Sequence, residues 1–128
     1  MKKIELIGHQ GDLIIFATEG VPEGKKIVDQ QCKDKTLAYG ELSGHAHQFA
    51  NEANVDVFKI NDPKYEGLIF VQPKEDVILR HGRDRNFKGV EPDFDYHSEL
   101  LLLKDQTYIT GIVEETDWLT RTVRRVID

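Results

Sequence analysis

Apolar and polar residues alternate along most of this chain, and short groups of Gly, Pro, Asn and Asp separate the alternating segments. Alternation with a period of two is typical of β-strands that bury one face. Residues 55–60 (VDVFKI) show it most clearly, whereas residues 13–16 and 68–71 are continuously apolar and predict strands buried on both faces. The pattern predicts an all-β fold, with strands at residues 3–7, 12–18, 26–31, 36–42, 45–50, 55–61, 65–72, 77–81, 98–103 and 107–114.

The C-terminal tail is the one segment whose apolar residues recur at roughly helical intervals. From Asp117 onward, these residues include Leu119, Val123 and Val126. β-Branched residues such as Thr122 favour extended structure in the same segment. We predict a short C-terminal helix, with a strand as the alternative.

Length and composition indicate one globular domain. A chain of 128 residues can bury a core of its own, and 39% apolar with 31% charged residues is typical of soluble proteins. Neither a repeat nor a linker divides the sequence. We therefore expect a single β domain over residues 1–128, a small barrel or sandwich, with a long polar loop or arm at about residues 82–96.

Charge and cysteine content narrow the range of partners and compartments. The net charge of −6 argues against a nucleic-acid-binding protein, which needs a basic surface. Cys32 is the only cysteine, so no disulfide forms within the chain and a reducing compartment is expected. The apolar runs are too short for a membrane span or a signal peptide. We expect a cytoplasmic protein without membrane contact.

Two histidines one residue apart, His45 and His47, are the strongest chemical signal. Side chains at alternate positions of a strand point to the same side, so the two imidazoles share one face. Gly40 and Gly44 lie beside this strand and allow backbone or ligand to approach closely. Such a pair can chelate a divalent metal or present two polar groups to a small-molecule ligand.

Two further histidines extend this site. His81 ends a predicted strand and His97 precedes the next, so a hairpin-like loop between them would bring the two together. We predict His45, His47, His81 and His97 as metal ligands, with zinc first and nickel, copper or iron as alternatives. In the other interpretation, these histidines only pack or form hydrogen bonds. His9 is read as an ordinary surface residue.

The predicted loop begins with a basic cluster that ends in an aromatic residue. Its members are Arg80, Arg83, Arg85 and Phe87. They are predicted to contact a ligand or a protein partner, and the loop at residues 82–96 to support self-association. The alternative is a solvated, self-neutralising loop, since acidic residues follow directly.

The stretch at residues 41–47 (ELSGHAH) resembles the G-E-[VL]-[ST]-G-H-A-H signature of small uncharacterised all-β proteins from bacteria and phages. Residues 10–15 (QGDLII) and 125–128 (RVID) are similar to further motifs of those proteins. The resemblance implies a compact β fold with clustered histidines and a phage or mobile-element origin. Two departures are a long insertion between His81 and His97, and Gln48 where those proteins usually have Arg.

A weaker resemblance is to cupins, whose metal set is H-x-H, a following Glu and a distant His. Here these would be His45, His47, Glu52 and His81. Glu52 has the opposite parity on a straight strand and reaches the metal only if the chain turns at Asn51. Three functions follow: a binding or accessory protein with a histidine-built divalent-metal site, a cupin-like metalloenzyme acting on a small molecule, or a structural and assembly protein without metal. No catalytic residue is assigned.

Overall fold

The computed structural model describes residues 4–10, 13–22, 24–39, 45–83 and 99–112. Strands dominate it, and the all-β prediction is confirmed. No helix of the described part has the length and apolar character needed to cross a membrane. In chain order the elements are β1 (Ile4–Gln10), β2 (Leu13–Thr18), β3 (Lys26–Ile27), α1 (Gln30–Lys33), β4 (Thr36–Tyr39), β5 (His45–Gln48), β6 (Val55–Ile60), the 3-10 turn η1 (Pro63–Tyr65), β7 (Ile69–Pro73), β8 (Val77–Arg83), β9 (Leu100–Leu102) and β10 (Thr107–Ile112).

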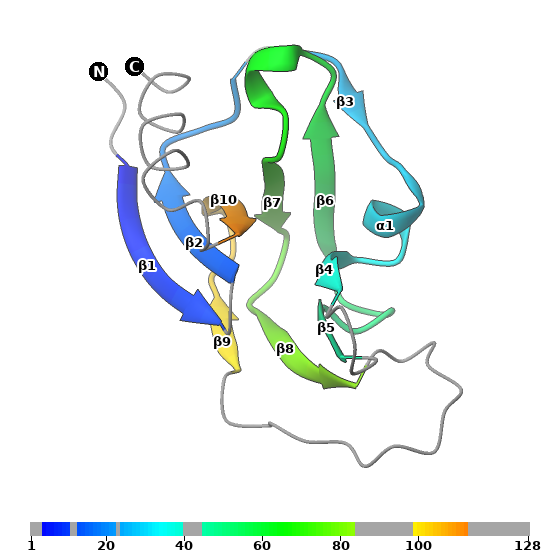
Figure 1. Ribbon diagram of the computed structural model, residues 1–128. Coiled ribbons are helices and arrows are strands. Elements are labelled where there is room, and N and C mark those ends of the chain that lie inside the picture. The colour runs from blue at the N-terminus through cyan, green and yellow to red at the C-terminus, as the bar shows by residue number, and fades with distance from the viewer. Residues whose placement is uncertain (1–3, 11–12, 23, 40–44, 84–98, 113–128) are drawn as a thin grey trace.

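The strands form two antiparallel sheets (Figure 1). The larger sheet has six strands in the order β1-β2-β10-β7-β6-β3, and the smaller has four in the order β4-β5-β8-β9. The chain passes from the larger sheet to the smaller between β3 and β4 and again between β7 and β8, and it returns between β5 and β6 and between β9 and β10. β8 and β9 pair antiparallel, with Leu79 opposite Leu100, so the two strands that flank the predicted loop are adjacent.

The main core combines apolar side chains from both sheets. The larger sheet contributes Ile15 and Val71, and the smaller contributes Leu79 and Leu102, all at 0% exposure. Phe49, which directly follows β5, joins them and is also 0% exposed. Burial of each such side chain is worth about 1.5–3 kcal/mol, so this shared core holds the two sheets together.

A second apolar cluster lies on the other face of the larger sheet. It contains Ile14 and Phe16 of β2, Phe58 of β6 and Phe70 of β7. The rings of Phe58 and Phe70 stack with their centroids 5.7 Å apart. Since neighbouring residues of β2 and β7 belong to different clusters, both strands are buried on both faces. This confirms the interpretation of the continuously apolar runs at residues 13–16 and 68–71.

Two predicted strands are shortened by local helix starts. The strand expected at residues 26–31 ends at Ile27, because the Asp29 carboxylate accepts the Cys32 backbone N–H at 2.9 Å and begins α1. The strand expected at residues 65–72 begins only at Ile69, because Pro63 at the first position favours η1. In both places a local helix-start signal outweighs the period-two pattern.

The predicted loop and tail fall largely outside the described residues. The loop is predicted from about residue 82, and β8 extends through Gly82 and Arg83, two residues beyond the strand predicted at residues 77–81. The strand pairing with β5 extends to these two positions and accounts for the difference. Residues 84–96 of the loop and the helix predicted from Asp117 lie outside the described part.

Asp29 links α1 to β6 and gives the fold a defined acid sensitivity. Its Oδ2 lies 2.8 Å from Lys59 Nζ. The hydrogen bond to Lys59, followed by that from the Cys32 backbone, lowers the pKa of Asp29 from 3.8 to about 2. A carboxyl with a lowered pKa stabilises the fold fully above its unfolded pKa, and this stabilisation is lost as the pH falls through the folded value.

Asp29→Ala is therefore expected to lower the free energy of unfolding by about 1 kcal/mol at pH 7, an amount reduced by solvent screening of the half-exposed pair. The difference in unfolding free energy between this variant and the wild type should decrease as the pH falls from 5 toward 2. Urea denaturation across this range measures it. The matched control is Asp56→Ala, which removes an exposed ion pair to Lys74 at 3.6 Å and should cost less. Equal losses of unfolding free energy in Asp29→Ala and Asp56→Ala would contradict the role of Asp29 as both the cap of α1 and the ion-pair partner of Lys59.

Candidate functional site

His47 and His81 lie directly opposite each other in the adjacent strands β5 and β8. Their rings stack, with centroids 4.2 Å apart and planes inclined by 11°. Phe49 and Leu79, two positions away along the chain, are core residues, so both histidines belong to the core-facing side. His47 is 3% exposed, and the Nδ1 atom of His81 is buried. The pair is thus built into the end of the core between the sheets.

Gln10, the last residue of β1, joins this pair from the other sheet. Its Nε2 donates to the backbone carbonyl of Leu79 at 2.6 Å, and its Oε1 lies 2.8 Å from His47 Nδ1. Gln10 is 0% exposed. A backbone carbonyl only accepts hydrogen bonds, so the amide nitrogen must face Leu79 and the amide oxygen must face His47.

This orientation of Gln10 determines the hydrogen position on neutral His47. An amide oxygen only accepts, so Nδ1 of His47 carries the hydrogen and Nε2 carries the lone pair. Metal-binding histidines have the same arrangement, in which one ring nitrogen donates to an oxygen and the other binds the ion. The contacts of Gln10 therefore prepare Nε2 of His47 as an acceptor or a ligand.

The stacked arrangement limits how His47 and His81 act together. A metal ion lies in the plane of each imidazole that binds it, about 2.0–2.1 Å from the nitrogen for zinc. Two nearly parallel planes with centroids 4.2 Å apart share no point within that distance. In this arrangement only one of the two rings can bind a given metal ion. For both histidines to bind the same ion, one ring must rotate out of the stack.

The other predicted ligands are only partly described. His45 lies opposite Arg83, two positions along β5 from His47, and the side chains of His45 and Arg83 lie outside the described part. His97 lies outside it altogether. Among the side chains that are described, no group of three or more His, Cys, Asp or Glu could hold a metal ion. The structure thus brings His47 and His81 together and adds Gln10.

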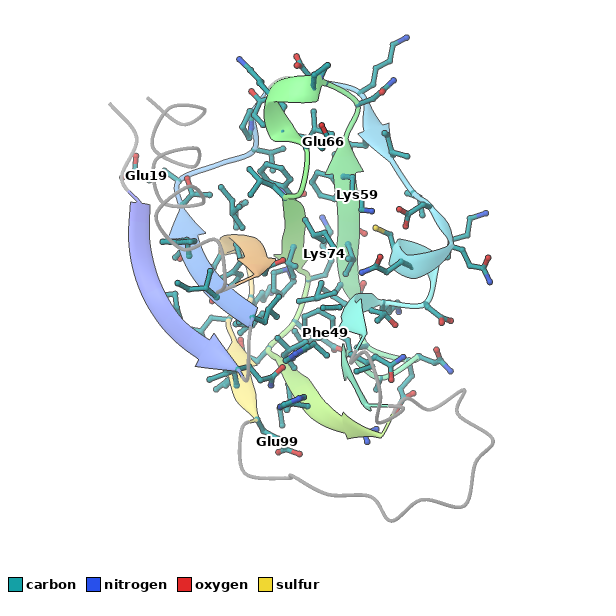
Figure 2. The ribbon with its side chains drawn as sticks, viewed as in Figure 1. Glu19, Phe49, Lys59, Glu66, Lys74 and Glu99 are labelled. Atoms are coloured by element: carbon teal, nitrogen blue, oxygen red, sulfur yellow. The ribbon has the colours of Figure 1, made fainter. Side chains whose placement is uncertain are left out.

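The outer face of β8 carries a different set of polar residues. Arg80 is half-buried and lines a hollow of about 370 Å³ together with Glu52 and Glu99. Figure 2 shows Glu99 at the end of the molecule where β9 begins, and Phe49 in the interior. Glu52, the carboxylate that a cupin-like site would use, is exposed in this outer hollow. Arg85 and Phe87 lie outside the described residues.

A family model matches residues 9–92 of the chain, about two thirds of its length. The chain belongs to the family described as a domain of unknown function, DUF8820. No curated protein and no solved structure matches it. The segment shared with DUF8820 includes Gln10, His45, His47 and His81, and it ends before His97. The described part of the site therefore lies entirely within the DUF8820 segment.

Sequence reasoning missed Gln10 as a member of the site. The residue begins the QGDLII run, which supported a family resemblance but indicated no chemistry. Gln10 and His47 are 37 positions apart and come from different sheets. A buried glutamine at the end of a strand becomes informative only when the residue opposite its amide is known.

Proposed function

We propose that this protein is a small binding protein that holds a divalent metal ion, with zinc as the first choice, at the histidines of β5. The hydrogen-bonded chain from the Leu79 carbonyl through Gln10 to His47 Nδ1 carries this proposal. Metal-binding histidines commonly donate their other ring N–H to an acceptor oxygen, and the amide oxygen of Gln10 is such an acceptor. Imidazole nitrogen is also a ligand type that zinc, nickel and copper prefer.

The proposed ligands begin with His45 and His47, which lie two positions apart in β5. His81 is the proposed third ligand, and its ring would have to turn out of the stack on His47 to reach the same ion. His97 remains the predicted fourth. The buried thiol of Cys32 belongs to α1 and takes no part in this set.

The parallel stacking of His47 and His81 favours a second candidate function. Two rings that pack face to face in a buried, hydrogen-bonded setting suit a structural or assembly domain without metal. In that case the hydrogen bonds of Gln10 would hold β1 against β5 and β8.

For either function we propose the cytoplasm as the location, or the host cytoplasm if the protein is phage-borne. The free thiol of Cys32 supports this location.

Metal analysis of untagged protein tests the proposal. We expect zinc, or another of the proposed metals, in protein purified without added metal. After removal of metal with a chelator, added Zn²⁺ should raise the melting temperature. A ligand at 100 times its Kd stabilises the folded state by about 2.7 kcal/mol, which is several degrees in a domain of this size. Mg²⁺ is the matched control, since it prefers oxygen ligands and should have no effect.

The two candidate functions give opposite results in this experiment. Protein that contains no metal and whose melting temperature does not respond to Zn²⁺, Ni²⁺ or Cu²⁺ would contradict metal binding and support the structural candidate. An equal response to Zn²⁺ and Mg²⁺ would also contradict a histidine-built site, because it would indicate carboxylate ligands.

A further inference from the structure

Three large apolar side chains lie exposed together on the outer face of β8 and β9. Ile78 and Leu101 are directly opposite each other in the two strands and are 50% and 58% exposed. Leu103, which directly follows β9, is 51% exposed. We call these three residues the β8–β9 strip. Contiguous exposed apolar side chains of this size mark interaction surfaces more often than single ones do.

The strip lies on the outer side of a strand pair whose inner side belongs to the main core. Val77 and Leu79 of β8 alternate with Ile78 and are 4% and 0% exposed in the main core. Leu102 of β9 is likewise 0% exposed. In β2, by contrast, apolar side chains on both faces are buried within the fold. A strand pair that carries large apolar side chains on an exposed face is expected to be covered by a partner.

The charges that flank the strip are complementary to a second copy of the same surface. Arg80 lies on the outer face of β8, two positions after Ile78, and the exposed Asp76 directly precedes the strand, where its Oδ1 accepts the Lys104 backbone N–H at 2.8 Å. A two-fold axis that crosses the strands at Ile78 reverses the strand direction in the partner. It therefore places Arg80 of each copy opposite the partner's Asp76, which gives two equivalent pairs of opposite charge. Ile78 and Leu101 then each face their own counterparts.

We propose that the β8–β9 strip is the contact surface of a homodimer of this chain. The hollow of about 370 Å³ beside the strip has Ala50, Ala53 and Val77 in its apolar wall and can receive side chains of the second copy. The strip is small, so the dimer belongs with weak assemblies, with a Kd on the order of 10 μM. This proposal does not depend on metal binding by the histidines.

Sedimentation analysis between about 1 and 500 μM protein tests the dimer, a range that brackets the expected Kd. The wild type should shift from monomer to dimer, and Leu101→Glu should raise Kd by at least about tenfold, because it buries a carboxylate in the centre of the interface. The matched control is Val28→Glu, at a residue that is 52% exposed and follows β3 in the other sheet. It should leave the dimer unchanged. Both variants change exposed residues, and equal melting temperatures confirm that they fold.

A cysteine at the axis gives a second, direct readout. Sheets packed face to face lie about 10 Å apart, which is too far for a disulfide, so a short bis-maleimide should crosslink Ile78→Cys to its counterpart across the axis. The same reagent should not crosslink Val28→Cys. The native Cys32 does not interfere, since it is 3% exposed and burial raises the pKa of its thiol to about 11.

Several results would overturn the proposal. The wild type could remain monomeric over the whole concentration range, or the dimer could persist unchanged in Leu101→Glu. Equal crosslinking of Ile78→Cys and Val28→Cys would also contradict it. A purified monomer whose strip instead binds a different protein would overturn the second copy as the occupant.

Discussion

Replacing His47 with alanine is expected to weaken zinc binding by more than about 100-fold, whereas replacing Gln10 with leucine should weaken it by about 10- to 100-fold. His47 is the proposed ligand itself, so its loss removes a metal–nitrogen bond. Gln10 does not contact the metal in the proposal. It holds the hydrogen of His47 on Nδ1 and the lone pair on Nε2, so its loss lets the ring change tautomer and turn.

The two variants also separate binding from folding. Gln10→Leu removes the buried partner of both the Leu79 carbonyl and His47 Nδ1, and should lower the free energy of unfolding by about 1–3 kcal/mol even without metal. Competition with a chromophoric chelator measures zinc affinity, and urea denaturation of the metal-free protein measures stability. His9→Ala is the matched control, since His9 precedes Gln10 in β1 at a position of opposite parity.

Three outcomes would contradict this scheme. Unchanged zinc affinity in His47→Ala would remove His47 from the ligand set. A loss in His9→Ala equal to that in His47→Ala would show that the effect is not specific to this site. Unchanged stability and affinity in Gln10→Leu would show that the amide neither supports the fold nor orients the ring.

Replacing Phe49 with alanine is expected to lower the free energy of unfolding by about 3–5 kcal/mol. Phe49 is 0% exposed in the main core, and its backbone N–H donates to the Lys35 carbonyl at 2.9 Å. Removing the ring leaves a cavity directly beyond β5, the strand that carries His47. Domains of this size are stable by about 5–15 kcal/mol, so the variant loses a large part of its total stability.

Urea denaturation followed by circular dichroism measures this loss. Phe49→Leu keeps most of the volume and should cost less than about 1.5 kcal/mol. Leu101→Ala, at an exposed position of β9, should change stability by less than about 0.5 kcal/mol. A cost for Phe49→Ala no larger than that for Leu101→Ala would mean that Phe49 does not join the two sheets.

The strands could be predicted because their signals are local. A period of two, with Gly and Pro between segments, requires no knowledge of distant residues. Local chemistry also explains the errors at Asp29 and Pro63, where a cap and a fixed proline φ start helical turns inside expected strands. These two signals were present in the sequence, but the alternation of apolar residues masked them.

The site was predictable only in its local part. The spacing of His45 and His47 places them on one face of any strand, whatever the rest of the fold does. That His81 lies opposite His47, and Arg83 opposite His45, depends on the register of β5 against β8. Register is set by the packing of side chains such as Phe49 and Leu79 in the shared core, so it is not encoded in either segment alone.

The amino-acid sequence by itself determined the all-β class and the two-sided burial of β2 and β7. Only the tertiary structure decided that Gln10 orients His47, that the rings of His47 and His81 stack, and that the apolar strip on β8 and β9 remains exposed. The physical reason is the range of the interactions. Backbone geometry acts between neighbours in the chain, whereas hydrogen bonds and packing between sheets join residues that the sequence keeps far apart.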